Sequence, residues 1–209
     1  MKAPIPHLGL LVLSVLGTSP AAAATWTIGA NFGVSYLHET DTPYNTGITT
    51  IAVPSGSGVA TGGVQAGVRV GTILDGHEHE FYLDGGVISF AGNSTSSIGT
   101  MATINYQFNG ASPGRTTYPY LAVGGGLLYQ AEDVTSVYYY PYPLFYSSRV
   151  SGTNALLGVG LGLKHVMHHG HGDLRGELRF DHVAEGSGNL RLPSSTSFGL
   201  KLGFDLWMR

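Results

Sequence analysis

The chain contains no cysteine, which excludes disulfide bonds and thiol redox chemistry. Charged residues make up only 11% of the sequence, and no basic patch indicates binding to nucleic acid. A long apolar run is missing after residue 24: the longest candidate, Leu121 to Tyr129, has nine residues and three glycines. A helix that crosses a bilayer needs about 20 apolar residues. If the chain spans a membrane, it must therefore do so as a closed barrel, because lipid cannot satisfy an open sheet edge.

Glycine, in contrast, is abundant, with 32 of 209 residues, about twice its average share. The glycines are not embedded in proline-rich or highly charged low-complexity sequence. We interpret them as sites of tight backbone packing rather than as a sign of disorder.

The first 24 residues have the features of a secretory signal peptide. Lys2 is the only charge in this stretch, the apolar run Leu8 to Leu16 follows it, and the small residues Ala21 to Ala24 end it. We expect cleavage after Ala24, so that residues 25–209 form a single mature domain. A permanent membrane anchor is disfavoured, because the run is shorter than a spanning helix requires.

Eight segments alternate apolar residues with small or polar residues at a period of two. This is the pattern of barrel strands that face lipid on one side and a lumen on the other. In the first segment, for example, Trp26, Ile28 and Phe32 alternate with Thr27 and Gly29. The third segment is the least regular. The expected strands lie at 26–36, 64–71, 80–87, 102–108, 119–130, 155–164, 174–181 and 200–208.

The expected links between these strands alternate between short and long, as in membrane barrels with short periplasmic turns and long external loops. Both chain ends then fall on the periplasmic side. The expected short links lie at 75–77, 109–115 and 167–173, and the long ones at 38–59, 91–100, 131–152 and 184–195.

The position of the charged residues decides between two kinds of barrel. A soluble barrel of the lipocalin kind has apolar residues inside and polar residues outside. Arg or Lys on a lipid-facing surface near mid-membrane costs about 2–4 kcal/mol each, and an unpaired charge in an apolar core costs more. A polar lumen with five charges of each sign avoids both costs, so we predict an all-β, eight-stranded, antiparallel up-and-down transmembrane β-barrel. The expected lumen charges are Arg69, Glu80, Asp84, Lys164, Arg175, Glu177, Arg179, Asp181, Lys201 and Asp205.

Three segments of the chain resemble the OmpA/OmpX-like superfamily of small outer-membrane β-barrels. Tyr118 to Gly126 resembles the Pro-Tyr and glycine strand that is common in these proteins, and Leu174 to His182 resembles their penultimate strand. The C-terminal Gly203, Leu206 and Met208 are similar to the terminal assembly signal. The family usually ends on an aromatic residue, whereas this chain ends Trp207-Met208-Arg209.

The resemblance covers the whole mature chain and implies an outer-membrane β-barrel domain at residues 25–209. It implies insertion by the barrel assembly machinery with periplasmic chaperones, and a monomer surrounded by outer-membrane lipid and lipopolysaccharide. None of the three motifs specifies an activity, a cofactor or a metal.

The expected lumen charges have two interpretations. They could gate a narrow channel or form a proton relay. Alternatively, the ion pairs fill a barrel that is just wide enough for side chains, with Tyr120 and Trp207 adding bulk. We favour the filled lumen because an eight-stranded barrel is so narrow.

An aromatic stretch in the expected external link at 131–152 also has two interpretations. Tyrosines offer large, rigid contact area for surface binding or adhesion. Alternatively, the neighbouring strands extend outward and the tyrosines form an interfacial girdle, although two prolines argue against a long hairpin. The aromatic residues of this stretch are Tyr138, Tyr139, Tyr140, Tyr142, Phe145 and Tyr146.

Clustered histidines could bind a metal ion through imidazole nitrogens, but few carboxylates and no cysteine accompany them. We expect solvated turn residues instead. The histidines concerned are His77, His79, His165, His168, His169 and His171.

A lipid A deacylase of the PagL type carries a His-x-Ser pair late in its chain. Here His182 holds the comparable place, but Ala184 replaces the serine, and Ser187 has the wrong spacing. Without a nucleophile this acyl transfer cannot proceed.

We therefore predict a protein without enzymatic activity or cofactor that contributes to envelope integrity or to surface adhesion through its external loops. Two alternatives from other classes remain open. The first is a narrow conduit for small hydrophobic molecules, as resemblance to OmpW-like barrels suggests, and the second is a lipid A-modifying hydrolase.

Overall fold

The computed structural model describes residues 24–39, 60–74, 77–91, 96–111, 114–139, 143–167, 171–188 and 194–208. Eight long strands form one antiparallel sheet, and a two-residue strand, β8, is added to β6. Their bounds are β1 Thr25–Glu39, β2 Ala60–Leu74, β3 His79–Ala91, β4 Ser96–Asn109, β5 Thr117–Tyr139, β6 Pro143–Val166, β7 Gly172–Val183, β8 Ser187–Gly188 and β9 Ser195–Met208.

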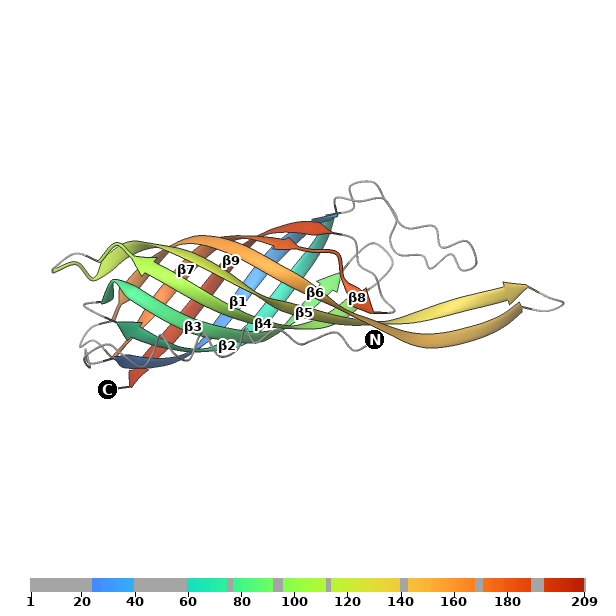
Figure 1. Ribbon diagram of the computed structural model, residues 1–209, viewed down its shortest axis with the longest axis horizontal. Coiled ribbons are helices and arrows are strands. Elements are labelled where there is room, and N and C mark those ends of the chain that lie inside the picture. The colour runs from blue at the N-terminus through green and yellow to red at the C-terminus, as the bar shows by residue number, and fades with distance from the viewer. Residues whose placement is uncertain are drawn as a thin grey trace, which may run out of the picture.

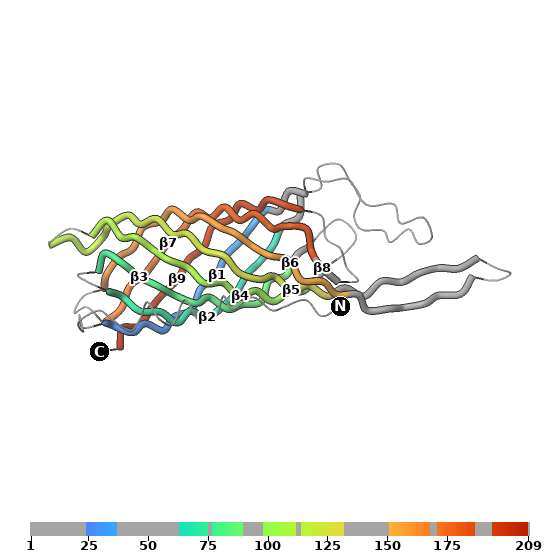
Figure 2. The backbone as a smooth tube through the Cα atoms, viewed as in Figure 1, coloured from blue at the N-terminus to red at the C-terminus, as the bar shows by residue number. Residues whose placement is uncertain are grey.

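The sheet closes on itself. Each long strand pairs with its neighbours in the chain, and β9 pairs with β1, so the order β5-β4-β3-β2-β1-β9-β7-β6 returns to β5. Figures 1 and 2 show the resulting elongated barrel, whose strands are tilted relative to its long axis. The predicted eight-stranded up-and-down barrel is therefore confirmed, with the predicted eighth strand now labelled β9.

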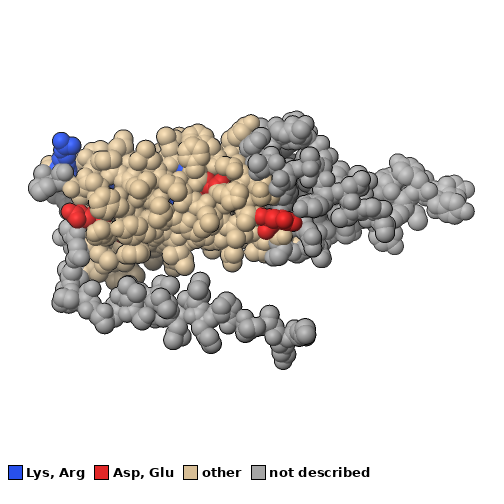
Figure 3. All heavy atoms as spheres, turned by 45° about the horizontal axis from the view of Figure 1, so that its top comes forward, with Lys and Arg blue, Asp and Glu red and all other residues tan. Residues whose placement is uncertain are grey.

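The two faces of the wall follow the predicted alternation. Leu157 is 68% exposed on the outside, whereas the preceding Leu156 is 4% exposed on the inside. Where side-chain burial is described, the exposed charged side chains are those of Glu78, Arg115 and Glu185. Figure 3 accordingly shows a wall that is largely free of charge on the face in view. An apolar exterior around charged interior side chains suits lipid and would not suit a soluble barrel.

The height of the apolar exterior matches a bilayer. On β1, outward-facing residues run from Trp26 to Tyr36, which lie ten positions apart. Ten steps of about 3.3 Å span about 33 Å along the strand. A tilt of about 40° reduces this to about 25 Å along the barrel axis, the height of the apolar band in membrane barrels.

Two predicted links are wrong in their bounds. β3 ends at Ala91 and β4 begins at Ser96, so only residues 92–95 remain of the link predicted at 91–100. β5 and β6 also continue through most of the link predicted at 131–152, with pairing from Ala131↔Ser151 to Tyr139↔Pro143. The prolines do not prevent this hairpin, because Pro143 is the first residue of its strand, where proline is tolerated.

Among the residues that the structure describes, no helix is both long enough and apolar enough to cross a membrane. The predicted signal peptide and the predicted link at 38–59 fall largely outside the described residues.

Candidate functional site

Arg69 of β2 lies at the centre of the barrel lumen and is 1% exposed. Its guanidinium approaches Asp84 at 3.3 Å, Asp205 at 3.5 Å and Glu80 at 3.6 Å. It also lies over the ring of Tyr82, with its central carbon 3.0 Å from the ring centroid. One cation thus holds three carboxylates from β3 and β9, which are distant along the chain, at the same level of the lumen.

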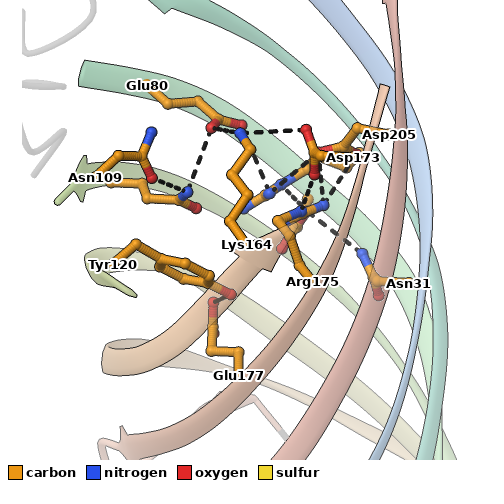
Figure 4. A network of polar contacts seen from close by, with 12 residues as sticks. Asn31, Glu80, Asn109, Tyr120, Lys164, Asp173, Arg175, Glu177 and Asp205 are labelled. Carbon is orange, nitrogen blue, oxygen red and sulfur yellow. Dashed lines mark hydrogen bonds and ion pairs between the residues drawn. The ribbon is translucent and has the colours of Figure 1, made fainter. Parts of the chain in front are cut away.

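Lys164 of β6 links Glu80 of β3 to Asp173 of β7 (Figure 4). Its ammonium donates to Glu80 at 2.7 Å and lies 3.2 Å from Asp173. The indole N–H of Trp207 donates to Asp173 at 2.7 Å, and the ring of His77 stacks on Trp207 with centroids 4.9 Å apart. Trp207 precedes Met208, the last residue of β9, so the two rings lie near the end of the barrel at which this strand ends.

A ladder of alternating charge follows the inner face of β7. Asp173, Arg175, Glu177, Arg179 and Asp181 lie two residues apart, and side chains two apart in a strand share a face. Arg175 lies 3.3 Å from Asp173, and Arg179 lies 3.4 Å from Glu177 and 2.8 Å from Asp181. Each charge is thereby placed beside one of opposite sign, which offsets the cost of removing both from water.

Glycines on β6 make room for this ladder. Gly158, Gly160 and Gly162 are the register partners of Asp181, Arg179 and Glu177. A Cβ at Gly160 would lie 2.6 Å from the carboxyl group of Glu177, and one at Gly158 would meet Asp181 directly. The abundant glycine of the sequence therefore reflects close packing of lumen side chains against bare backbone.

All ten predicted lumen charges point into the barrel, and each takes part in at least one ion pair. Lys201 donates to Asp84 at 2.7 Å, and Arg175 lies 2.8 Å from Asp205. Sequence reasoning missed Asp173, which is 0% exposed. It was assigned to a turn, although the period of two along β7 extends back to it. The described lumen therefore holds five cations and six carboxylates, rather than five of each.

The other end of the lumen is apolar, which was not predicted. Ile88, Leu128, Leu156 and Val183 are buried together, with Met101 packed against them. The sequence signal is a pair of adjacent apolar residues at 87–88, 127–128 and 156–157, which breaks the alternation. Two consecutive apolar residues in a strand place one on each face, so the inner face is apolar there as well.

The described lumen is thus filled in three layers: stacked rings, paired charges and an aliphatic cluster. Tyr120 adds to the filling, because its hydroxyl donates to Glu177 at 3.0 Å. Each of the six described lumen carboxylates is engaged by Arg or Lys.

The candidate hydrolase residues do not converge. Asp181 points inward to Arg179, whereas the adjacent His182 is exposed on the outer face. Neighbouring residues of a strand face opposite sides of the sheet, so these two do not form a catalytic pair. Ala184 follows the strand, and its backbone N–H donates to the carbonyl of Ala155 at 2.9 Å.

The predicted histidine clusters are distributed over different environments. His79 faces outward and lies 2.8 Å from the Tyr106 hydroxyl, and His165 lies 2.7 Å from the Thr117 hydroxyl. No group of three metal-ligating side chains occurs among the described residues. His168 and His169 lie outside them.

The remaining predicted site residues lie at the two ends of the barrel. Leu206 and Met208 face outward on β9, and Gly203 lies among the inward positions of the same strand. Tyr138, Tyr139, Phe145 and Tyr146 belong to the hairpin strands. Tyr140 and Tyr142 lie outside the described residues.

Comparison of the fold with solved structures returns Neisserial surface protein A, with a TM-score of 0.60 and 14% identity. The match covers 88% of this chain and 98% of that one. The fold is that of an outer-membrane β-barrel. No family model and no curated protein matches the sequence. The N-terminal barrel domain of Pseudomonas aeruginosa OprF (16% identity, covering 84% of this chain and 97% of that one) has a TM-score of 0.38, too low to add weight.

The similarity to Neisserial surface protein A concerns the fold. The apolar belt, closed sheet and charged lumen of this chain are the features that outer-membrane β-barrels share. The predicted resemblance to small outer-membrane barrels of the OmpA/OmpX-like kind is confirmed at the level of the fold.

Proposed function

We propose that this outer-membrane barrel is non-enzymatic, that its lumen is sealed, and that it acts at the cell surface through the hairpin of β5 and β6. The observation that carries this proposal is the combination of a filled lumen with a hairpin that extends nine residue pairs from Ala131↔Ser151 to Tyr139↔Pro143. If the barrel cannot pass solutes, its function must depend on the elements that are exposed outside the membrane. A contribution to envelope integrity follows from the same rigid, membrane-embedded plug.

The charge network argues against a conduit for hydrophobic molecules. Such a molecule would have to displace side chains such as Arg69 and Lys164, which are 1% and 0% exposed. Each displaced ion pair would leave charges unpaired in a narrow space, at a cost of several kcal/mol. The conduit is therefore the weaker of the two proposals.

A lipid A hydrolase is supported less still. The serine that the deacylase pattern requires is replaced by Ala184, and His182 faces away from Asp181. A histidine without a nucleophile or an orienting carboxylate lacks the parts of an acyl-transfer site.

Replacing residues 134–148 by a short Gly/Ser turn is expected to reduce surface attachment at least fivefold while leaving the barrel folded. The hairpin tip combines six aromatic residues with little charge, which favours contact over solvation. Cells that express the full chain would be scored for partition into hexadecane droplets and for binding to serum-coated plates.

The matched control replaces residues 189–193, in another predicted external link, by a Gly/Ser segment of equal length. Heat-modifiable migration in gels would verify that both variants form barrels. Attachment that is unchanged without the hairpin, or lost equally in the control, would contradict the proposed role.

A further inference from the structure

Beyond the barrel, the hairpin of β5 and β6 has two edges that no described strand pairs with. The last residue of β5 that pairs with β4 is Ala131, opposite Ile98. On the other side, the outermost pairing of β6 with β8 is Gly152↔Gly188. No strand in the described part of the chain pairs with the outer edges of residues 132–139 or 143–151. Figure 1 shows these two strands continuing past the barrel along its long axis.

The edge of β5 lacks the features that protect native edges from pairing. Such edges carry charges, prolines or bulges. No Asp, Glu, Lys or Arg occurs from Val134 to Ser148. Pro143 belongs to β6, and the register from Thr117↔His165 to Tyr139↔Pro143 continues without a bulge. The β5 edge is therefore a regular row of backbone donors and acceptors that another strand can satisfy.

We propose that residues 134–138 of β5 pair with the same residues of a second copy on a facing membrane, with Ser136 opposite the Ser136 of that copy. This inference rests on the proposed surface role of the hairpin and names its partner. Two such edges form a four-stranded antiparallel sheet that links two barrels across the gap between membranes.

Geometry selects a facing copy over a neighbour in the same membrane. Copies in one membrane are related by an axis along the membrane normal, so their β5 strands would run parallel. The hairpin continues along the barrel axis (Figure 1), so copies on facing membranes present β5 strands that run in opposite directions. Antiparallel pairing about a twofold axis then closes after two copies, because each contributes the same surface.

The sequence of the edge is suited to self-pairing. Like charges directly opposite each other destabilise paired strands, and an uncharged edge avoids this when it meets its own copy. Glu132 and Asp133 precede the five-residue edge and lie nearest the barrel. Five residues at about 3.3 Å each give about 17 Å of overlap, the length of an ordinary strand.

The test uses the full chain in vesicles prepared by detergent removal, with protease cleavage verifying that hairpins are accessible on the outside. Vesicles with donor lipids and vesicles with acceptor lipids would be mixed, and tethering followed by energy transfer. We expect tethering when both populations carry the protein and none when one population is protein-free.

A charge swap makes the test specific for the β5 edge. Ser136→Lys on both populations is expected to abolish tethering, because lysines approach one another across the new pairing. Mixing Ser136→Lys vesicles with Ser136→Glu vesicles should restore it. Ser147→Lys, which places the same charge on β6, is the matched control and should tether like the parent chain.

Each other result overturns the inference in a distinguishable way. Tethering to protein-free vesicles would identify a lipid surface as the partner and leave the surface role of the hairpin standing. Absence of tethering, with hairpin-dependent cell attachment retained, would indicate another partner, such as a foreign peptide. Tethering that survives the Gly/Ser replacement of residues 134–148 would contradict both the inference and the proposed function.

Discussion

Replacing Arg69 by Met is expected to lower the free energy of unfolding by about 3–5 kcal/mol, the usual cost of removing one partner from a buried ion pair. Methionine preserves much of the volume but leaves Glu80, Asp84 and Asp205 without the cation that approaches all three. The lumen charge would change from five cations and six carboxylates to four and six.

Urea unfolding in lipid vesicles, followed by tryptophan fluorescence, would measure the change. Arg115→Met is the matched control: Arg115 is exposed, and its replacement should change the unfolding free energy by less than about 0.5 kcal/mol. Adding Asp205→Asn to Arg69→Met should recover part of the loss, because it lowers the excess of carboxylates over cations in the described lumen from two to one. A loss below about 1 kcal/mol for Arg69→Met would show that the ion pairs are not tightly packed.

The second large effect is expected from a single methyl group at Gly126 of β5. A Cβ there would meet the backbone carbonyl oxygen of Ala102 and lie 2.7 Å from the Cα of Thr103. Both are main-chain atoms of β4 that cannot rotate away. Gly126→Ala is therefore expected to destabilise the barrel by about 1–3 kcal/mol, as overpacking does.

Gly85→Ala provides the matched control, because the added Cβ would lie 4.0 Å from its nearest neighbour, the carbonyl oxygen of Met101. That variant should be neutral or more stable by about 0.4–1 kcal/mol, since alanine restricts the unfolded chain. The same urea titration would compare the two. Equal losses would indicate a general cost of losing glycine in the strands and would contradict the close approach of β4 and β5.

The barrel and its charged lumen were predictable because both depend on a period of two. Arg69, Lys164 and Arg175 each fall on the face opposite the bulky apolar residues, and lipid excludes them from the outside. The sequence alone does not predict which charges form ion pairs with each other. Arg69 and Asp205 lie 136 residues apart, and only the closure of β9 onto β1 brings them to one level.

The errors concern places where alternation is weak or stops. Leu156 and Leu157 are consecutive and face opposite sides of β6, so a strict alternation of apolar and polar residues does not predict the apolar inner cluster. Asp173 was missed because glycine and histidine residues around it resemble a turn. The length of the hairpin is not predicted from its proline content, because the effect of a proline depends on its position. Pro143 is the first residue of β6, where proline is tolerated.

The sequence motifs argue against one function, that of a lipid A deacylase, but they do not identify the function that the protein has. The deacylase pattern fails at Ala184 in the sequence already, and the opposite facing of Asp181 and His182 adds a second reason. The free edge of β5, by contrast, follows from strand pairing, which the order of residues does not reveal.

Electrical recording from the purified full chain in planar lipid bilayers tests the sealed lumen most directly. The amount of inserted protein should be determined in the same membranes. The filled lumen predicts a current that stays at the baseline, without reproducible opening steps. Reproducible steps of uniform size in proportion to the inserted protein would contradict the account and favour a conduit.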